Sequence, residues 1–413
     1  MKLLIVADGR SPITLNWIQY LVENGHIVNL VSTYPCILDD PRVSLSIIPV
    51  AFSQFVQKKN QKEGELFQNK SHQFQKFIIK SAASPKLRTI LRQWFGPLTI
   101  SKAAKKLRQY INQVQPDLVH AMRIPYEGML AAEINSSTPL IVSVWGNDFT
   151  LHAKANPWMR KRTRKAIMRA DAIHTDCWRD LRLAHEWGFS PRKPSIVLPS
   201  SGGVQMDVFY PPSKDESLRN IPGGEGKSFT VINPRGFRAY VRNDIFFSAI
   251  PLVIDRLPGT RFICPGMETE NQAHQWISDL MISDVVDLLP FQSPKQLANL
   301  FRKAQVTVSP TVHDGTPNSL LEGMACGCFP VVGDLESIRE WITPELNGLL
   351  INPTNVHELA DAIIKAITQP ELRARAADYN IQLISERAEY QIVMSDAVSF
   401  YEQVFKAQTG KSL

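Results

Sequence analysis

Short apolar runs alternate with longer amphipathic stretches through most of the chain, and this alternation predicts the fold class. In the first half, runs typical of buried strands lie at residues 2–7, 27–32, 118–121, 140–144 and 172–175. Helical patterns separate them, as at residues 14–24, where apolar positions recur every three or four residues. Strands that alternate with helices indicate a parallel sheet covered on both faces. We therefore expect a doubly wound, Rossmann-like α/β domain here.

The same alternation restarts after a polar break. Pro211-Pro212 opens a stretch with the composition of a linker, which runs to Lys227. Beyond it, strands are predicted at 229–233, 261–264, 285–289, 306–309 and 329–332, and helices at 294–303 and 319–325. We therefore expect an N-terminal domain at 1–210 and a C-terminal domain at 211–384. A last helical stretch, about 385–413, is expected to cross back onto the first domain.

Composition and cysteine usage narrow the class of protein. With 44% hydrophobic and 21% charged residues, the chain of 413 residues is globular in composition. Its apolar runs are too short for a membrane-spanning helix, and residues 1–7 are too short for a signal-peptide core. The five cysteines, an odd number, are scattered, and Cys326 and Cys328 have no partnering Cys/His pair. Zinc is therefore not expected, and the cytoplasm is the expected compartment.

Charge is distributed unevenly along the chain. Residues 1–200 hold 28 of the 46 Lys and Arg but only 14 of the 39 Asp and Glu. Within them, residues 51–110 carry 13 basic and two acidic side chains, interspersed with aromatic residues such as Phe74, Phe77 and Trp94. Either this segment lies on an anionic membrane surface, or it is a solvated lid with some core anchors. Nucleic acid is not an expected partner, because no recognisable nucleic-acid motif accompanies the charge.

The most informative stretch is residues 309–327. A predicted strand enters the loop Asp314-Gly315-Thr316-Pro317, and a helix is expected to begin at Asn318 or Ser319, both good N-cap residues. The free N–H groups of a first helical turn and the helix dipole favour a diphosphate. Asp314 and Glu322, with seven residues between them, can reach opposite ends of one sugar nucleotide. From spacing alone, a capped helix with two solvated acids remains an equal alternative.

This stretch resembles the acidic motif of the retaining glycosyltransferases of the GT-B fold, the large group often called family four. The similarity includes Leu321-Glu322-Gly323-Met324-Ala325-Cys326-Gly327, continues through Phe329-Pro330-Val331-Val332 and Glu340 to Asn347-Gly348-Leu349-Leu350, and runs through most of residues 200–365. It implies a GT-B fold of two facing domains, with the donor in the second domain and the acceptor in the first. It also implies transfer with retention at the anomeric carbon.

The resemblance assigns roles to individual residues. Glu322 would accept hydrogen bonds from the donor ribose, and Asp314 would face hydroxyls of the transferred sugar. The family usually has Glu at the first acidic position, so the shorter Asp314 implies a sugar that sits differently or is unusual. The remaining donor-binding candidates lie in and after the loop, with one more after the strand at 285–289; they are Gly315, Thr316, Pro317, Asn318, Ser319 and Phe291.

Cations for a diphosphate are expected after the first strand of the second domain. Arg235 lies there, where the resembling enzymes have a Gly-Arg, and they carry a lysine five residues later. Position 240 is Tyr in this chain, so Arg242 is the candidate for the second cation and Arg238 the reserve. Two guanidinium groups can clamp phosphate oxygens and stabilise charge on the leaving group. No Asp-x-Asp metal motif is present, so neither a metal nor another cofactor is expected to be required.

Acceptor-side signals are weaker. Gly9 and Arg10 lie in the loop after the first strand, where resembling enzymes often have paired glycines. Residues 117–123 are similar to the family's Asp-x-x-His-x-His strand, which leaves His120 as a catalytic candidate and Arg123 beside it; a packing role for His120 is equally open. Asp148, in a Trp-Gly-x-Asp segment, would either bind acceptor hydroxyls or cap the next helix.

Together these features predict a retaining glycosyltransferase of the hexosyltransferase type. It would move a sugar from a nucleoside diphosphate sugar to a glycan, a lipid-linked or a small-molecule acceptor, in the cytoplasm or peripherally on the inner face of the membrane. The alternatives are a non-catalytic module that binds sugar nucleotides and another GT-B enzyme such as a sugar-nucleotide epimerase. A glycogen-type phosphorylase would need a cofactor lysine site that the sequence does not offer.

Overall fold

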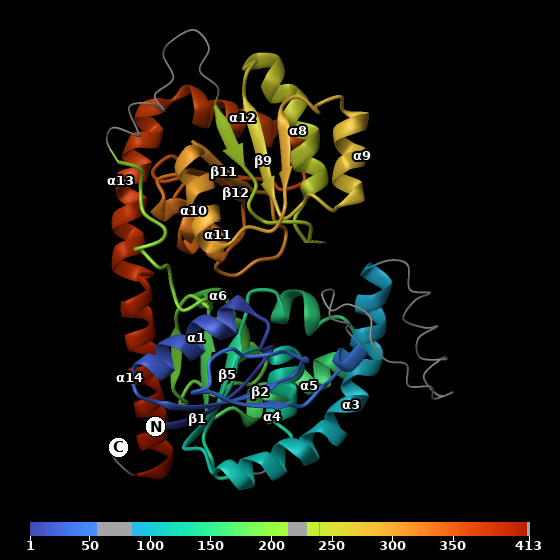
Figure 1. The fold of residues 1–413 in the computed structure, drawn as a ribbon, viewed down its shortest axis with the longest axis vertical. Helices are drawn as coiled ribbons and strands as arrows, with labels where there is room; N and C mark the ends of the chain where they lie inside the picture. The colour runs from blue at the N-terminus through green and yellow to red at the C-terminus, as the bar shows by residue number, and fades with distance from the viewer. Residues whose placement is uncertain (56–84, 135, 214–228, 239, 411–413) are drawn as a thin grey trace. The chain divides into compact units, whose positions relative to one another are not determined.

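The computed structural model describes residues 1–55, 85–134, 136–213, 229–238 and 240–410 (Figure 1). They form two α/β units, as the sequence predicts. Unit 1 comprises Met1–Thr175, Asp180–Val197 and Ala397–Leu413; unit 2 comprises Asp176–Arg179 and Leu198–Asp396. The C-terminal segment returns to unit 1, as expected, but it does so from Ala397, and unit 2 begins before the predicted linker. Residues 214–228 of that linker and 56–84 of the basic segment lie outside the described residues.

Unit 1 is built on a parallel sheet of seven strands in the order β3-β2-β1-β4-β5-β6-β7. The strands are β1 (Lys2–Ala7), β2 (Ile27–Ser32), β3 (Ser44–Ile47), β4 (Leu118–Ala121), β5 (Leu140–Val144), β6 (Ala172–Thr175) and β7 (Ser195–Val197). Five of them are the strands predicted from the apolar runs. The short edge strands β3 and β7 lack such a run, because each is largely exposed on at least one face.

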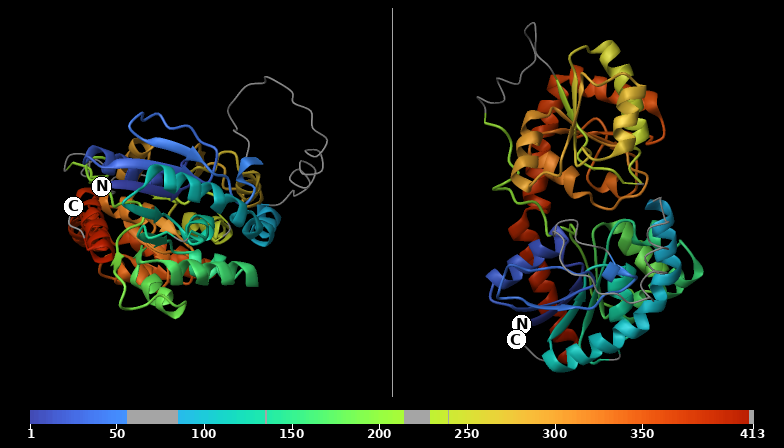
Figure 2. Two further views of the ribbon diagram at one scale, coloured as in Figure 1. Left: turned by 90° about the horizontal axis from the view of Figure 1, so that it is seen from below. Right: turned by 45° about the vertical axis from the view of Figure 1, so that its right-hand side comes forward.

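Helices cover both faces of the unit 1 sheet. They are α1 (Pro12–Glu23), α3 (Pro85–Val114), α4 (Met129–Ala131), α5 (Pro157–Arg169), α6 (Trp178–Glu186) and the end of α14 (Tyr390–Thr409), with the short turns η1 (Ser53–Phe55), η2 (Ile124–Gly128) and η3 (Asp148–His152). Side chains alternate along each strand. Leu4 and Val6 of β1 therefore pack toward α3, whereas α1 and α14 cover the opposite face, in agreement with Figures 1 and 2.

Unit 2 has a parallel sheet of six strands in the order β10-β9-β8-β11-β12-β13. The strands are β8 (Thr230–Ile232), β9 (Arg261–Pro265), β10 (Val286–Leu289), β11 (Val306–Ser309), β12 (Phe329–Gly333) and β13 (Leu349–Ile351). The order doubles back between β8 and β11, and this is where open α/β sheets bind ligands, beyond the carboxyl ends of the strands. The loops that follow β8 and β11 carry Arg235 and Asp314.

The helices of unit 2 are α8 (Asn243–Arg256), α9 (Asn271–Asp279), α10 (Pro294–Lys303), α11 (Asn318–Ala325), α12 (Val356–Thr368) and α13 (Pro370–Arg387), with the turn η4 (Ile338–Glu340). Apolar side chains of α8 and α12 fill one face of the sheet, and those of α10 and α11 fill the other, while α13 contributes to both clusters. The predicted C-terminal helix is interrupted at Ala388, whose φ of −140° ends α13, and α14 begins two residues later.

None of the described helices combines the length and the apolar character that crossing a bilayer requires.

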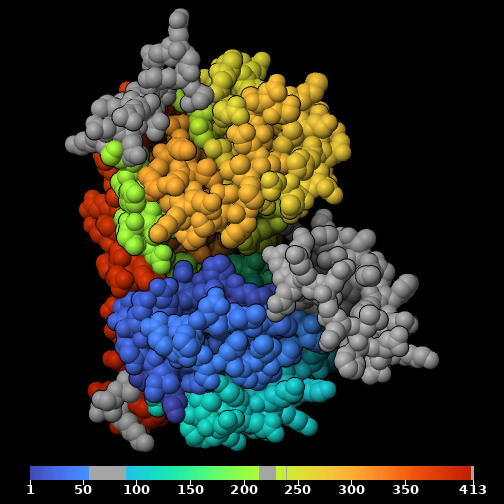
Figure 3. Space-filling view, viewed as in Figure 1, coloured from blue at the N-terminus to red at the C-terminus, as the bar shows by residue number. Residues whose placement is uncertain are grey.

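In the space-filling view, residues of the first three strands and their loops (blue) cover one face of unit 1 (Figure 3).

Candidate active site

Four predicted donor-site residues come together in unit 2, at the carboxyl ends of β8 and β11. Arg235 Nη2 donates to Asp314 Oδ2 at 2.5 Å, and Arg235 Nη1 donates to Ser319 Oγ at 3.3 Å. Glu322 lies one turn after Ser319 on α11, so both face the same side of the helix. The cluster therefore holds one guanidinium, two carboxylates and a hydroxyl.

The amino end of α11 is left without a side-chain cap. Pro317 occupies the N-cap position, and not Asn318 or Ser319 as predicted, because Asn318 already has helical backbone geometry. The first-turn N–H groups thus lack an intrahelical partner, and the helix dipole adds a partial positive charge there. Arg235 Nε and Asn318 Oδ1 are also buried without a hydrogen-bond partner among the described residues. The first-turn N–H groups and Arg235 Nε are donors that suit an anion, whereas Asn318 Oδ1 can only accept a hydrogen bond.

Burial changes the pKa of Glu322, the second acid of the motif. Loss of hydration raises the pKa of the partly buried Glu322 carboxyl to about 7, although the charge of Arg235 opposes the shift. Glu322 is therefore close to half-ionised at neutral pH. A carboxyl poised in this way can be driven to the ionised form by a ligand that donates two hydrogen bonds to it.

The backbone of the acidic loop is held by residues that sequence reasoning missed. Arg179 Nη1 donates to the Asp314 carbonyl at 2.6 Å, and Ser337 Oγ donates to the same oxygen at 2.7 Å. Gly315 lies so close to Asp176 that a β-carbon on it would be 2.4 Å from that carboxylate. The loop can approach Asp176 this closely because glycine has no side chain. In the sequence, the Gly of Asp-Gly-x-Pro is the one signal for this contact.

Other predicted donor-side residues have different side-chain partners. The backbone of Arg242 lies beside the acidic loop, since its N–H donates to the Pro310 carbonyl at 2.9 Å. Arg242 is paired with Asp244 at 2.6 Å, and Arg238 donates to the Tyr240 hydroxyl at 3.0 Å. Phe291 is 83% exposed. The guanidinium of Arg235 thus lies beside the carboxylate of Asp314, whereas that of Arg242, the proposed second cation, is paired with Asp244.

A pocket of about 190 Å³ lies in unit 1 at the carboxyl ends of β1, β4 and β5. Its walls include Asp8, Arg92, Arg123, Tyr126 and Trp145. The backbone of Tyr126 has φ of 74°, which is unusual for a bulky residue, in the short turn η2 that forms one wall. Strained backbone of this kind clusters at binding and catalytic sites.

The acceptor-side candidates collect around this pocket. Asp148 is buried beneath it and accepts hydrogen bonds from Arg123 Nε and from the backbone N–H groups of Ile124 and Trp145, at 3.0–3.2 Å. Burial raises the pKa of Asp148, and Arg123 opposes that shift. Asp148 therefore positions the walls and caps no helix through its side chain. Arg123, by contrast, lines the cavity directly.

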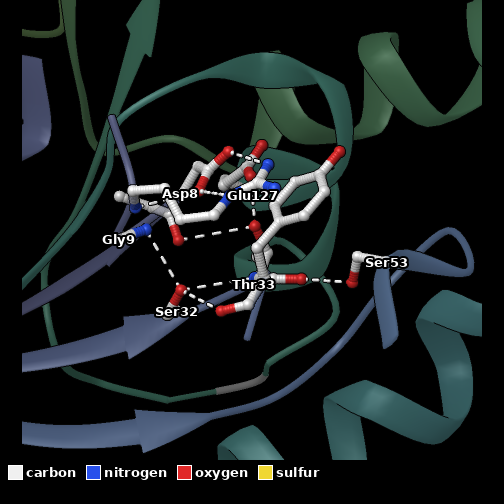
Figure 4. A network of polar contacts seen from close by, with 9 residues as sticks. Asp8, Gly9, Ser32, Thr33, Ser53 and Glu127 are labelled. Carbon is white, nitrogen blue, oxygen red and sulfur yellow. Dashed lines mark hydrogen bonds and ion pairs between the residues drawn. The ribbon is translucent and has the colours of Figure 1, made fainter. Parts of the chain in front are cut away.

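A hydrogen-bond network supports the opposite wall of the pocket (Figure 4). The Gly9 N–H donates to Ser32 Oγ at 3.0 Å, while Thr33 Oγ1 donates to the buried carboxylate of Glu127 at 2.6 Å. Ser53 Oγ donates to the Thr33 carbonyl at 2.5 Å. A β-carbon at Gly9 would lie 2.6 Å from the sulfur of Cys36, so the close approach of this loop requires glycine.

Arg10 is held beside the same wall. Its guanidinium donates to Asp8 at 2.8–2.9 Å and lies 3.8 Å from the ring centre of Tyr34. Sequence reasoning found Gly9 and Arg10 but missed Arg92, Tyr126 and Glu127. Glu127 is four residues after the predicted Arg123, and a charged residue inside an apolar stretch is the only signal that would have found it.

His120 lies in the core, away from the pocket. Its Nδ1 is 2.6 Å from the Tyr401 hydroxyl and its Nε2 is 2.7 Å from Ser143 Oγ, which in turn contacts His174. The ring is fully buried, and burial lowers its pKa well below the usual value. This is the packing role that the sequence left open, and the catalytic role predicted for His120 finds no support in the geometry.

Comparisons with known proteins agree with this architecture. Residues 215–383 match the family model for glycosyl transferases group 1, and residues 71–176 match that for glycosyl transferase 4-like domains. Similar solved structures are the sucrose-phosphate synthase of Thermosynechococcus elongatus (14% identity, 98% of this chain and 100% of that chain, TM-score 0.73) and Anabaena Alr3699/HepE in complex with UDP (14% identity, 97% and 99%, TM-score 0.70). These likenesses show the fold.

Curated relatives match over a shorter span. The D-inositol 3-phosphate glycosyltransferase of Thermobifida fusca is 27% identical over 204 residues, which are 47% of this chain and 46% of the relative. The enzyme of the same name from Saccharomonospora viridis is 25% identical over 234 residues, 53% of each chain. The chain thus spans about half the length of the curated relatives it matches. On these matches and this architecture, the chain belongs to the group 1 glycosyltransferases of the GT-B fold.

Proposed function

We propose that the chain transfers a sugar, with retention at the anomeric carbon, from a nucleoside diphosphate sugar bound in unit 2. The observation that carries this proposal is the cluster of Arg235, Asp314, Ser319 and Glu322 at the uncapped amino end of α11. It offers donors for a diphosphate and two acceptors for hydroxyls. The solved Anabaena Alr3699/HepE complexes contain UDP and UDP-glucose, and this supports a donor of the same class.

The cluster suggests how the chemistry would be divided. The diphosphate would meet the first-turn N–H groups of α11 and the guanidinium of Arg235, which stabilise the charge that develops on the leaving group. Glu322 would accept hydrogen bonds from ribose hydroxyls, and Asp314 from the transferred sugar. The glycosidic bond to phosphate breaks as the acceptor oxygen bonds to the same face of the sugar, and the acceptor proton passes to the leaving phosphate. No metal and no further cofactor is required in this scheme.

The acceptor would bind in the pocket of unit 1. That pocket presents carboxylates, arginines and aromatic rings, the side-chain types that bind hydroxylated rings. A lipid-linked or glycan acceptor would place only its terminal group there, because about 190 Å³ is less than the roughly 300–1,000 Å³ of pockets that bury drug-sized ligands.

Peripheral association with an anionic membrane in the cytoplasm fits the surface of unit 1. Helix α5 carries six basic residues beside the exposed Trp158 and Met168, and it contacts α3, which exposes Trp94, Phe95 and Leu98. Basic side chains interspersed with exposed apolar ones are typical of helices that lie on anionic bilayers.

The test is a thermal-shift screen of nucleoside diphosphates and their sugars, followed by turnover with the donor that binds. A donor at 100 times its dissociation constant adds about 2.7 kcal/mol to the stability of the folded state. Proton NMR of the product then gives the anomeric configuration. Binding without transfer or donor hydrolysis would identify a non-catalytic module, and an inverted product would refute retention.

A further inference from the structure

Two buried N–H donors line the unit 1 pocket without a partner. Arg92 Nε and Trp145 Nε1 have no hydrogen-bond acceptor among the described residues, and both residues line the cavity. Buried polar groups in native proteins are nearly always paired, so each exception needs an explanation. Neither group can accept a hydrogen bond. A ligand that satisfies both must therefore bring acceptor atoms.

Among the described residues, the charge of Arg92 also has no ion-pair partner. Arg10 is paired with Asp8 and Arg123 with Asp148, whereas the described part of the chain places no carboxylate within ion-pair distance of Arg92. Its guanidinium lies 4.5 Å from the ring centre of Tyr126 and 5.2 Å from that of Tyr34. The two rings fix the guanidinium through its faces, which leaves its edge for a ligand.

A third donor points to the same chemistry. Burial, with the charges of Arg123 and Arg92, lowers the pKa of His152 to about 3, so its imidazole is neutral at neutral pH. Gln93 Nε2 lies 3.4 Å from His152 Nδ1. Where that amide donates to Nδ1, the ring proton is on Nε2. The wall formed by Arg92, Trp145 and His152 is then a wall of donors.

The lining of the pocket also holds acceptors. Asp8 and Glu127 line the same cavity, and Thr33 fixes the carboxylate of Glu127 (Figure 4). These carboxylates suit hydroxyl groups and repel a second anion. The lining of the pocket thus offers both donors for an anion and acceptors for hydroxyls, in a volume of about 190 Å³.

We propose that the pocket binds a hydroxylated ring of monosaccharide size that carries one anionic group, a phosphate or a carboxylate. The anion bonds to Arg92 and Trp145, and the ring hydroxyls bond to Asp8 and Glu127. The proposal rests on the proposed function in one respect, that this ring is the acceptor or its terminal residue.

Indole N–H signals of the full chain provide a test at the site itself. The chain has eight tryptophans, and the signal lost in Trp145→Phe identifies Trp145 Nε1 in a 15N-tryptophan spectrum. The probes are glucose 6-phosphate, glucuronate and glucose, with UDP present to fill the donor site. At least one anionic sugar is expected to shift the Trp145 signal at millimolar concentration, with an affinity ten or more times that of glucose. The stronger of the two identifies the anion as phosphate or carboxylate.

Matched variants separate the pocket from non-specific binding. Arg92→Gln is expected to weaken the anionic sugar at least tenfold and to leave glucose unchanged, whereas the exposed Arg42→Gln should change neither. If Arg92→Gln fails to fold, Arg92→Lys replaces it as the test variant. This variant keeps the positive charge but loses the planar guanidinium, so its affinity for the anionic sugar should also fall. No shift of the Trp145 signal with either anionic sugar, or equal affinity for glucose, overturns the proposal.

Failure of the proposed function gives a different pattern. If UDP and other nucleoside diphosphates do not bind unit 2, the donor assignment fails while the Trp145 shift can still be measured. If they bind, and a nucleoside diphosphate sugar gives transfer to a neutral acceptor while the Trp145 signal stays unmoved, the anion site alone is wrong.

Discussion

The guanidinium of Arg235 is bound to the carboxylate of Asp314, with only 9% and 15% of the two side chains exposed. The cation proposed for the diphosphate and the acid proposed for the sugar thus neutralise each other before any donor arrives. A donor diphosphate competes with Asp314 for Arg235, and the released carboxylate becomes an acceptor for sugar hydroxyls. Breaking a partly buried ion pair is costly unless the ligand replaces both partners, so a complete donor is favoured over a fragment.

Arg235→Ala is expected to weaken nucleoside diphosphate binding roughly 10- to 100-fold, because a hydrogen bond to a charged group is worth about 1.5–3 kcal/mol. Turnover should fall further, since the charge on the leaving group grows in the transition state. Calorimetry and initial rates measure the two effects. The control is Arg256→Ala, which removes an exposed arginine paired with Asp361 elsewhere in unit 2. Near-wild-type activity of Arg235→Ala with saturating donor would refute the assignment.

Asp314→Asn separates the two functions of the pair. The variant frees Arg235 from a competing carboxylate, so affinity for the free nucleoside diphosphate should stay equal or rise. Affinity for the complete sugar nucleotide and the rate of transfer should both fall, because the sugar loses a charged acceptor. Competition binding with the diphosphate and the sugar nucleotide measures the difference. Equal losses for both ligands would place Asp314 on the nucleotide instead.

Glu322 gives unit 2 a stability that depends on pH. Its pKa is about 7 in the folded chain and near 4.5 when unfolded. Between these values the folded state binds more protons, so this group makes the free energy of unfolding fall as pH rises, by about 3 kcal/mol in all, and the effect levels off above pH 7. Glu322→Gln should therefore gain stability relative to wild type from pH 4.5 to pH 7.5. Urea unfolding across this range, with the exposed Glu371→Gln as control, measures it; parallel profiles for Glu322→Gln and wild type would contradict the expectation.

Most of the strands that sequence analysis found contain a recognisable run of apolar residues. β1 and β5 are buried on both faces, so their runs are unbroken, whereas β3 and β13 have only three or four residues and share their pattern with loops. The loop and helix around α11 could also be predicted from the sequence, because the Gly/Pro loop and the start of the helix are local signals. Its cap was misplaced by a residue, because Pro317 fixes φ near the value that an N-cap residue also adopts.

The candidate sites also differ in how far the sequence could predict them. Asp314 and Glu322 belong to one short motif, and the sequence sufficed to pair them with Arg235. Arg242 was expected to bind the diphosphate, whereas in the structure its guanidinium pairs with Asp244, two residues away. Arg92, Tyr126 and Glu127 meet only because α3 and η2 pack around the ends of β1 and β4. Such contacts depend on tertiary structure, which spacing along the chain does not encode.

Tyr401→Phe tests the structural role of His120. The hydroxyl of Tyr401 is the partner of His120 Nδ1, and its loss leaves a fully buried ring nitrogen unsatisfied. We expect a loss of about 1–3 kcal/mol in the free energy of unfolding, with nucleoside diphosphate affinity unchanged. Chemical denaturation and calorimetry measure the two quantities, and Tyr379→Phe on exposed surface is the control. A large fall in turnover at unchanged stability would instead return His120 to a catalytic role.

The proposed membrane binding would depend on α5 and the exposed apolar residues next to it. Each Lys or Arg near an anionic surface contributes about 1 kcal/mol, and partial burial of Trp158 adds to this. Wild-type protein should therefore sediment with vesicles as their phosphatidylserine content rises, and less so at high salt. Lys161→Glu with Arg164→Glu reverses two charges on α5 and should weaken sedimentation, as should Trp158→Ser alone. The matched control, Lys295→Glu with Arg256→Glu, reverses two charges in unit 2 and should have little effect. A protein that stays in the supernatant at every lipid composition has no membrane surface on α5, and a soluble acceptor then becomes the better substrate class.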